Sequence, residues 1–384
     1  MVSKNNIFKN LLHKESPAKY WIFCIAIYIS LIFSTGLFYA YGPEAVITME
    51  YFFSPPASIS PEFQERNPDF GMLHEQEIDL LSENFWKTSS VYSDAAYYIL
   101  QTESFDLSIA PYKYRFLPIL IVRLVQTITG LSTVKAFILM NISLTLLTAL
   151  IFTIYLIRYF DFTKQIAMLG GILFITMFPS TSTIAFPSME PVSLFFSMLI
   201  FYAVINKNVF LFLLFAISGV ATKEVLAISS LLWFVMTFQL KDKKALLLNT
   251  LISSIPVITF MLIRSIMGGN PLEVNYGYNL LKGEFPQNYG ARLFNFSGLF
   301  SITIKTFLSF SFLWLGLLNI RKNKTLMKFS IIIPFVILAA ILLSSRITRV
   351  LGIIFPVVIP LFLLFFNNLK SHQIKTATVQ IPFN

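Results

Sequence analysis

The stretch YWIFCIAIYISLIFSTGLFYAY, residues 20–41, is 22 residues long and contains no charged side chain. A helix of about 20 apolar residues is long enough to cross the ~30 Å hydrocarbon layer of a bilayer. Four lysines and one glutamate precede it, and no small-residue cleavage site follows it, unlike a secretory signal peptide. We therefore expect an uncleaved transmembrane helix whose N-terminal side faces the cytoplasm, where basic residues concentrate.

The composition of the whole chain agrees with a membrane protein. Of 384 residues, 56% are hydrophobic and 12% are charged, whereas an ordinary soluble domain has about 25% charged residues. The single cysteine, Cys24, excludes an intramolecular disulfide framework, and the three scattered histidines make a zinc site or a Ser-His-Asp triad improbable. No glycine-rich nucleotide motif occurs. We expect an all-α, polytopic integral membrane protein with a single transmembrane domain, residues 1–384.

Ten further apolar segments are candidates for membrane helices. They are residues 115–131, 134–157, 165–179, 191–206, 208–222, 224–240, 245–267, 296–319, 327–344 and 350–367. If all eleven crossed the membrane, the basic connectors at 241–244 and 321–328 would lie outside, against the positive-inside rule. We expect segment 115–131 not to cross, because its polar side chains share about 160° of helical arc. It then forms an amphipathic helix at the membrane interface, which leaves about ten transmembrane helices.

The charges separate by side of the membrane. With ten spans both termini are cytoplasmic, and that face carries 16 bases against three acids, so the net charge of +10 reports topology and not a nucleic-acid partner. The first extracytoplasmic loop, 42–133 with its juxtamembrane helices, differs: residues 42–113 hold 12 of the 19 acids and three bases. A second extracytoplasmic loop covers 268–295. Long loops between spans are usually functional or disordered, so we expect the functional site on the outer face.

Ionisable residues near the membrane gather on this outer side. They are Asp94, Lys113, Arg115, Glu190, Lys223, Glu224, Arg264, Lys305, Arg346 and Arg349. Asp94 lies in SDAAYY, residues 93–98, before the return to the membrane at PYKYRFLP, residues 111–118. A partly desolvated carboxylate at this place can take a proton from a hydroxyl as a general base. The structural alternative is that Ser93 or Asp94 caps a helix.

Glu190 also has two interpretations. Pro191 follows it and is expected to start a helix, so the helix dipole alone can explain a carboxylate at this position. The functional alternative is a second carboxylate facing Asp94 that binds an acceptor hydroxyl or holds a divalent cation, Mg²⁺ or Mn²⁺. Cations at Lys223, Arg346 and Arg349 are suited to an anionic phosphate at the interface.

These residues resemble the polytopic glycosyltransferases of the GT-C superfamily. The matching features are residues 93–98 and 111–118, Asn141, Arg158-Tyr159-Phe160, Glu190-Pro191, Lys223-Glu224, and Arg349 followed by Phe355-Pro356, spread over residues 91–360.

The resemblance implies an enzyme of the bacterial inner membrane whose active site faces outward. It would move a sugar from a polyprenyl-phosphate donor to a hydroxyl of a glycan, lipid or protein acceptor, with inversion at the anomeric carbon. Asp94 would be the base and Glu190 the second catalytic acid. The substrate-binding residues would be Tyr97, Lys113, Arg115, Lys223, Glu224, Arg346 and Arg349.

Several alternatives stay open. Asp94 lies about 50 residues beyond the first helix, whereas many members place their acid soon after it, so Glu44 or Glu50 is an alternative base. The chain lacks the C-terminal outer domain of several subfamilies, and Val350 follows Arg349 where an aromatic residue is common. A flippase for a lipid-linked glycan and a non-catalytic assembly factor that docks through its acidic loop are the competing functions.

Overall fold

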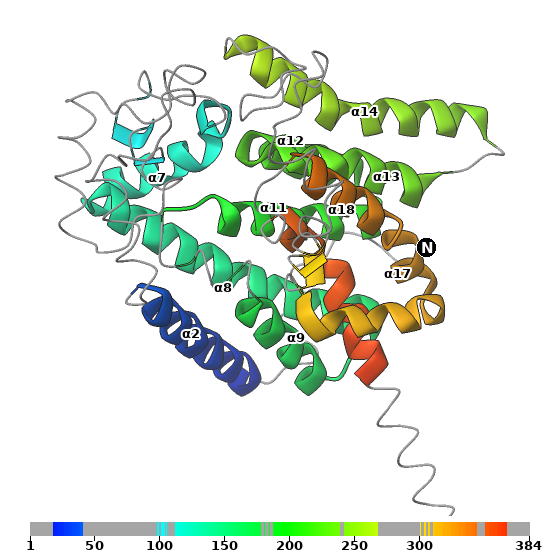
Figure 1. Ribbon diagram of the computed structural model, residues 1–384, viewed down its shortest axis with the longest axis horizontal. Helices are drawn as coiled ribbons and strands as arrows, with labels where there is room; N and C mark the ends of the chain where they lie inside the picture. Colours follow the sequence, from blue (N-terminus) through cyan, green and yellow to red (C-terminus); the bar gives the residue numbers. More distant parts are fainter. Residues whose placement is uncertain are drawn as a thin grey trace, which may run out of the picture.

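The computed structural model describes residues 18–40, 98–99, 101–103, 105, 112–177, 180, 184, 187–238, 242–267, 300, 303–304, 306–307, 310–343 and 350–366. Every regular element among them is helical (Figure 1), which confirms the all-α class. In chain order they are α2 (Ala18–Ala40), η2 (Tyr112–Tyr114), α7 (Phe116–Thr129), α8 (Thr133–Phe160), α9 (Lys164–Thr176), α11 (Glu190–Ile205), α12 (Val209–Thr222), η3 (Glu224–Ile228), α13 (Ser229–Thr237), α14 (Lys243–Ile266), η5 (Ser311–Lys322), α17 (Lys324–Phe329), α18 (Ile332–Leu343) and η6 (Gly352–Ile354), with 355–366 helical after it.

Local signals explain where several of these helices begin and end. The side chains of Thr163, Asn208, Asp242 and Asn323 accept hydrogen bonds from the first amides of α9, α12, α14 and α17. Gly130 ends α7 in the left-handed region, at φ 67°, and its N–H donates to the carbonyl of Gln126. The chain then turns back so that α8 packs against α7.

Three predicted segments differ from the structure. Segment 224–240 is divided into η3 and α13, segment 327–344 is divided into α17 and α18, and η5 extends to Lys322 instead of ending at residue 319. Lys223 separates α12 from η3. Lys223 is extended (φ −157°, ψ 124°), so that it and Glu224 extend toward different neighbouring elements.

Two apolar clusters hold the helices together. The larger joins α2, α8, α9, α11, α12, α13 and the C-terminal helices. The smaller contains Tyr98, Tyr112, Ile119, Val122, Ala136, Phe137, Met140, Met189 and Val192. It packs the starts of α7, α8 and α11 against one another.

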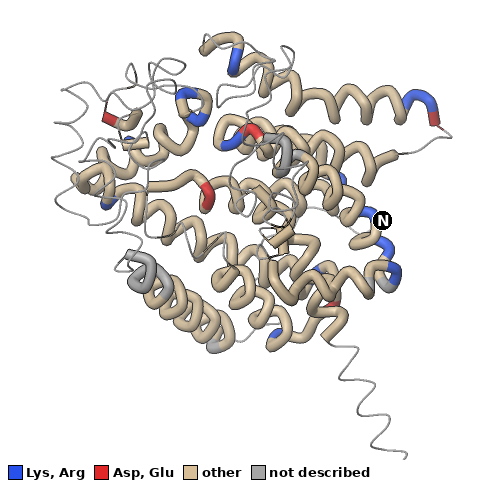
Figure 2. The backbone as a smooth tube through the Cα atoms, in the orientation of Figure 1, with Lys and Arg blue, Asp and Glu red and all other residues tan. Residues whose placement is uncertain are grey.

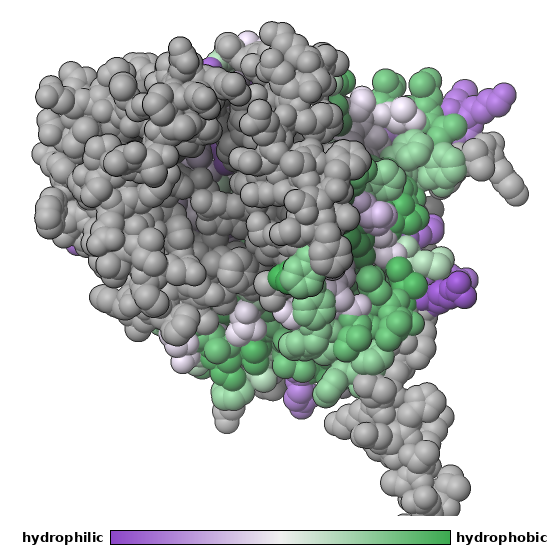
Figure 3. All heavy atoms as spheres, in the orientation of Figure 1, coloured by the Kyte–Doolittle hydropathy of each residue, from purple (hydrophilic) through white to green (hydrophobic). Residues whose placement is uncertain are grey.

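Apolar side chains form the core and also cover much of the described surface. On α14 the side chains of Leu247, Leu248, Leu251, Ile258, Leu262 and Ile266 are exposed, while Asn141, Thr145, Ser193 and Ser197 are buried between helices. Hydrophobic side chains cover much of the described surface in Figure 3. Small polar residues at helix contacts with apolar residues outside are typical of helices packed in lipid.

Helix length supports membrane crossing only in part. Within the described ranges two helices, α8 with 28 residues and α14 with 24, are long and apolar enough to cross a bilayer. The apolar helices α7, α9, α11 and α12 have 13–16 residues, and 14 residues rise only about 21 Å. The lengths therefore do not confirm about ten crossings.

Basic residues mark one end of the bundle. Lys243 and Lys244 open α14, and Lys324 and Lys328 belong to α17. In Figures 1 and 2 both places lie at the right, away from α7 at the left. This end contains connectors that the sequence assigns to the cytoplasm.

Candidate functional site

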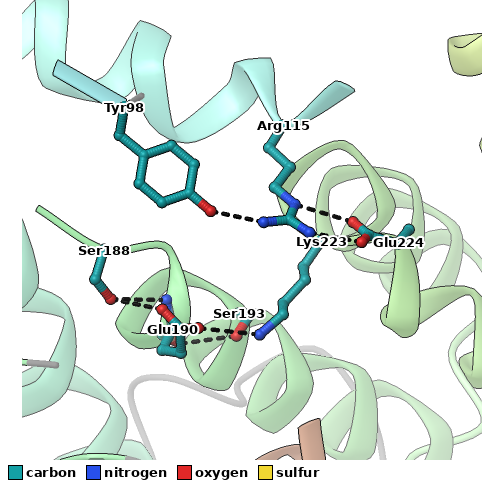
Figure 4. A network of polar contacts seen from close by, with 7 residues as sticks. All are labelled: Tyr98, Arg115, Ser188, Glu190, Ser193, Lys223 and Glu224. Atoms are coloured by element: carbon teal, nitrogen blue, oxygen red, sulfur yellow. Dashed lines mark hydrogen bonds and ion pairs between the residues drawn. The ribbon is translucent and has the colours of Figure 1, made fainter. Parts of the chain in front are cut away.

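Four of the predicted site residues form a compact cluster of two ion pairs (Figure 4). They are Arg115 directly before α7, Glu190 at the start of α11, and Lys223 and Glu224 between α12 and η3. We call these four residues the ion-pair cluster. The cluster joins parts of the chain that are up to 109 residues apart.

The first pair is a bidentate contact between Arg115 and Glu224. Arg115 Nε donates to Glu224 Oε2 at 3.0 Å and Arg115 Nη2 donates to Glu224 Oε1 at 2.6 Å. Arg115 Nη1 donates to the hydroxyl of Tyr98 at 2.7 Å, and the guanidinium lies over the ring of Tyr112 at 5.8 Å from its centroid. The arginine is 7% exposed, so the planar guanidinium is oriented by several partners at once.

The second pair joins Lys223 and Glu190. Lys223 Nζ lies 3.3 Å from Glu190 Oε1, and each side chain is 8% exposed. Ser188 Oγ donates to Glu190 Oε2 at 2.7 Å, and Ser193 Oγ donates to the backbone carbonyl of Glu190 at 2.8 Å. Pro191 occupies the first turn of α11 as expected, and Glu190 lies where the helix dipole favours a negative charge.

Lys223 and Glu224 form the bridge of the cluster. They are neighbours in the chain, yet Lys223 pairs with α11 and Glu224 pairs with the residue before α7. The ends of three helices are thereby tied together. Arg115, Glu190 and Lys223 are buried, and the side chain of Glu224 is 31% exposed. Each buried charge thus has a counter-ion, and the two cations and two carboxylates form a neutral set.

A short helical segment with residues 98–99 and 101–103 is held beside the cluster. Arg115 binds Tyr98, Arg123 Nε donates to the carbonyl of Thr102 at 2.9 Å, and the hydroxyl of Thr133 donates to Glu103. The hydroxyl of Thr102 also donates to the carbonyl of Tyr98 at 2.7 Å, a helical spacing. Asp94 precedes this segment by four residues in the sequence.

Of the remaining predicted site residues the structure describes Lys113, which makes no described contact with the cluster. Lys113 is half-buried, with Nζ 5.5 Å from the ring centroid of Tyr114. Outside the described residues lie Asp94, Tyr97, Arg346, Arg349, Glu44, Glu50, Lys305, the loop 268–295 and most of 42–113.

Three contact residues of the cluster were not predicted from the sequence. Tyr98 binds Arg115, whereas the prediction named its neighbour Tyr97, and Ser188 and Ser193 hold Glu190. The sequence feature that could have identified the serines is their position, with Ser188 two residues before Glu190 and Ser193 three residues after it. Arg264 contacts Tyr114, which precedes Arg115 in the chain. Its guanidinium is 5.2 Å from the ring centroid of Tyr114 and 4.6 Å from that of Phe260.

The described carboxylates of the cluster do not form a cation site. Among the residues that the structure describes, no group of three His, Cys, Asp or Glu side chains could hold a metal ion. Glu190 and Glu224 each face a basic side chain, which competes with a divalent cation for the same oxygens.

Comparison of the chain with protein-family models, curated proteins and solved structures finds no match.

Proposed function

We propose that this chain is a polytopic glycosyltransferase of the bacterial inner membrane, similar to the GT-C superfamily, with both termini cytoplasmic. It moves a sugar from a polyprenyl-phosphate donor to a hydroxyl of a glycan, lipid or protein acceptor on the extracytoplasmic side. One observation carries this proposal: the ion-pair cluster brings Arg115, Glu190, Lys223 and Glu224 together. These are residues that the resemblance assigned to one site.

The apolar side chains on the surface support the membrane location. Large apolar side chains point outward on α2, α14 and the C-terminal helices, and the buried positions include Arg115, Glu190 and Lys223. Exposed apolar area of this extent is unfavourable in water and favourable in lipid. The basic connectors at the end of the bundle away from α7 support an outward-facing cluster.

The cluster offers two cations to a lipid phosphate. A phosphate oxygen that replaces Glu224 on Arg115 retains the bidentate geometry of the guanidinium, and one that replaces Glu190 on Lys223 retains a compact charge contact. The leaving polyprenyl phosphate is a stable anion, so these cations stabilise the charge that develops as its bond to the sugar breaks.

Asp94 supplies the base in this proposal. Its carboxylate takes the proton of the acceptor hydroxyl, the oxygen attacks the anomeric carbon from the face opposite the phosphate, and the bond to the phosphate oxygen breaks with inversion.

Binding of polyprenyl monophosphate to the protein in nanodiscs tests the assignment of the cluster. We expect the double variant Lys223→Met/Glu190→Gln, which removes both members of one ion pair, to weaken binding at least tenfold. Lys164→Met at the start of α9 is the control, because that lysine belongs to a connector assigned to the cytoplasm. Equal affinity of the double variant, the control and the wild type would refute a phosphate site at the cluster.

A further inference from the structure

Gln101 is a polar residue that neither the sequence motifs nor the ion-pair cluster uses. Its side chain is fully buried, at 0% exposure, and both the amide nitrogen and the amide oxygen have no hydrogen-bond partner. Among the described residues it is the one side chain with two such atoms. Buried polar groups are nearly always paired, so a group left without partners on both atoms requires an explanation.

The backbone around Gln101 is held on both sides. Tyr98 is bound by Arg115, the carbonyl of Thr102 accepts from Arg123, and Glu103 accepts from Thr133. The turn therefore cannot easily rotate to bring the amide to water. The unpaired amide therefore belongs to a turn that is held in place by these hydrogen bonds.

Gln101 belongs to the helical turn that begins at Tyr98, whose hydroxyl meets the ion-pair cluster. Tyr98 and Gln101 are three residues apart, a spacing that places two side chains on the same side of a helix. The ring of Tyr98 packs edge-on against that of Tyr112, with centroids 5.2 Å apart at 82°, and its hydroxyl meets Arg115. The spacing of three residues places the amide of Gln101 on the side of the turn that carries Tyr98.

The chemistry of an amide selects the class of ligand. It offers one acceptor and two donors in a single plane, which matches two neighbouring hydroxyls, each able to donate and accept. A phosphate group has acceptors to offer and would leave the amide oxygen unpaired beside a negative charge. Aromatic rings at the same place suit the C–H faces of a sugar ring.

We propose that Gln101 binds vicinal hydroxyls of a sugar and forms a neutral sugar subsite beside the ion-pair cluster. This inference rests on the proposed function and deepens it, because it assigns the sugar and the phosphate to different residues.

The test compares Gln101→Met, which keeps the length of the side chain and removes its hydrogen-bonding groups, with the wild type. The probes are methyl glycosides of glucose, galactose and mannose, titrated by ligand-observed NMR against the protein in nanodiscs. We expect at least one glycoside to bind the wild type and to lose at least tenfold in affinity in Gln101→Met. The melting temperature of Gln101→Met without sugar should equal or exceed that of the wild type.

Gln126→Met is the matched control. The amide of Gln126 donates to the hydroxyl of Thr133 at 2.9 Å, so its loss should lower the melting temperature and leave glycoside binding unchanged. A Gln101→Met protein that melts as low as Gln126→Met, that fails to fold, or that binds glycosides like the wild type overturns the proposal. So does a wild type that binds none of the three glycosides.

Polyprenyl monophosphate and its glycosylated forms separate the two sources of the sugar. If Gln101 contacts the donor sugar, Gln101→Met weakens binding of the glycosylated lipid and leaves that of the bare phosphate within twofold. If it contacts the acceptor sugar, only the methyl glycoside loses affinity, and both results support a sugar subsite. The wild type could fail to bind polyprenyl phosphate and still bind glycosides in a way that depends on Gln101. That result would reject the polyprenyl-phosphate donor and keep the sugar subsite.

Discussion

At the residue scale, each cation of the candidate site is paired with a carboxylate. Lys223 and Glu190 are both 8% exposed on their side chains. Removing one member of a buried ion pair destabilises a protein more than replacing both members by apolar residues of similar size, because the remaining charge has no counter-ion. The pairing of Lys223 with Glu190 and of Arg115 with Glu224 therefore has energetic consequences that single and double substitutions can separate.

Replacement of Lys223 by Met should lower the free energy of unfolding by about 3 kcal/mol, because it leaves the carboxylate of Glu190 buried without a counter-ion. The double variant Lys223→Met/Glu190→Gln should recover most of that loss, since the glutamine can still accept from Ser188. Chemical denaturation in detergent micelles measures both. If the double variant is as unstable as the sum of its two single variants, the two side chains are not coupled.

Arg115→Lys should lower stability by about 1–2 kcal/mol although it keeps the charge. A lysine cannot reproduce the two parallel bonds to Glu224 together with the bond to Tyr98. Arg123→Lys is the matched control, since Arg123 makes one described bond, to the carbonyl of Thr102. Thermal unfolding of the two variants should show a clearly larger shift for Arg115→Lys, and equal shifts would contradict the bidentate role.

The sequence identified the charged members of the cluster but not their partners. Arg115, Glu190 and Lys223 stand out because charges are rare in an apolar chain. Which cation meets which carboxylate depends on how α7, α11 and η3 pack, over separations of 33 and 109 residues. Nothing local marks Tyr98 as the partner of Arg115, and Tyr97, which was predicted to bind substrate, lies outside the described residues.

At the element scale, the apolar runs predicted most helices to within a few residues. Segments 134–157 and 245–267 correspond to α8 and α14, because charged or capping residues bound both runs. The boundary predicted between residues 222 and 224 coincides with Lys223, whose extended backbone separates α12 from η3. The 3-10 geometry of η3, which continues directly into α13, was not predicted, since hydropathy is continuous from one to the other.

The contact of α2 with α8 and α9 makes a specific prediction. A Cβ on Gly171 of α9 would lie 2.0 Å from the hydroxyl of Tyr28, which is held by Thr153 on α8 at 2.7 Å. Gly171→Ala should therefore destabilise the protein by about 1–3 kcal/mol through overpacking, measured by thermal unfolding. Gly219→Ala should be close to neutral, because its new methyl group meets only movable side chains of Leu226 and Ile200 at 3.1 Å or more. Equal stability of the two variants would contradict the close contact.

At the scale of the whole molecule, the distribution of charge predicts the orientation in the membrane. The one native cysteine, Cys24, is buried, so Cys24→Ala provides a background for single cysteines at exposed helix ends. Cysteines at Lys207 and Lys243 should react with an impermeant thiol reagent only from the cytoplasmic side, and one at Lys113 only from the outside. Reaction of all three from one side would contradict an outward-facing cluster.

The central claim is that the outer cluster and its loop carboxylate perform sugar transfer. The most direct measurement is the rate at which purified protein in liposomes transfers labelled sugar from polyprenyl-phosphate-linked sugars to added acceptor glycans and lipids. We predict transfer by the wild type, with a loss of at least a hundredfold in Asp94→Asn and at least tenfold in Glu190→Gln, both shown to be folded. Transfer at the wild-type rate by folded Asp94→Asn and Glu190→Gln proteins would contradict the account.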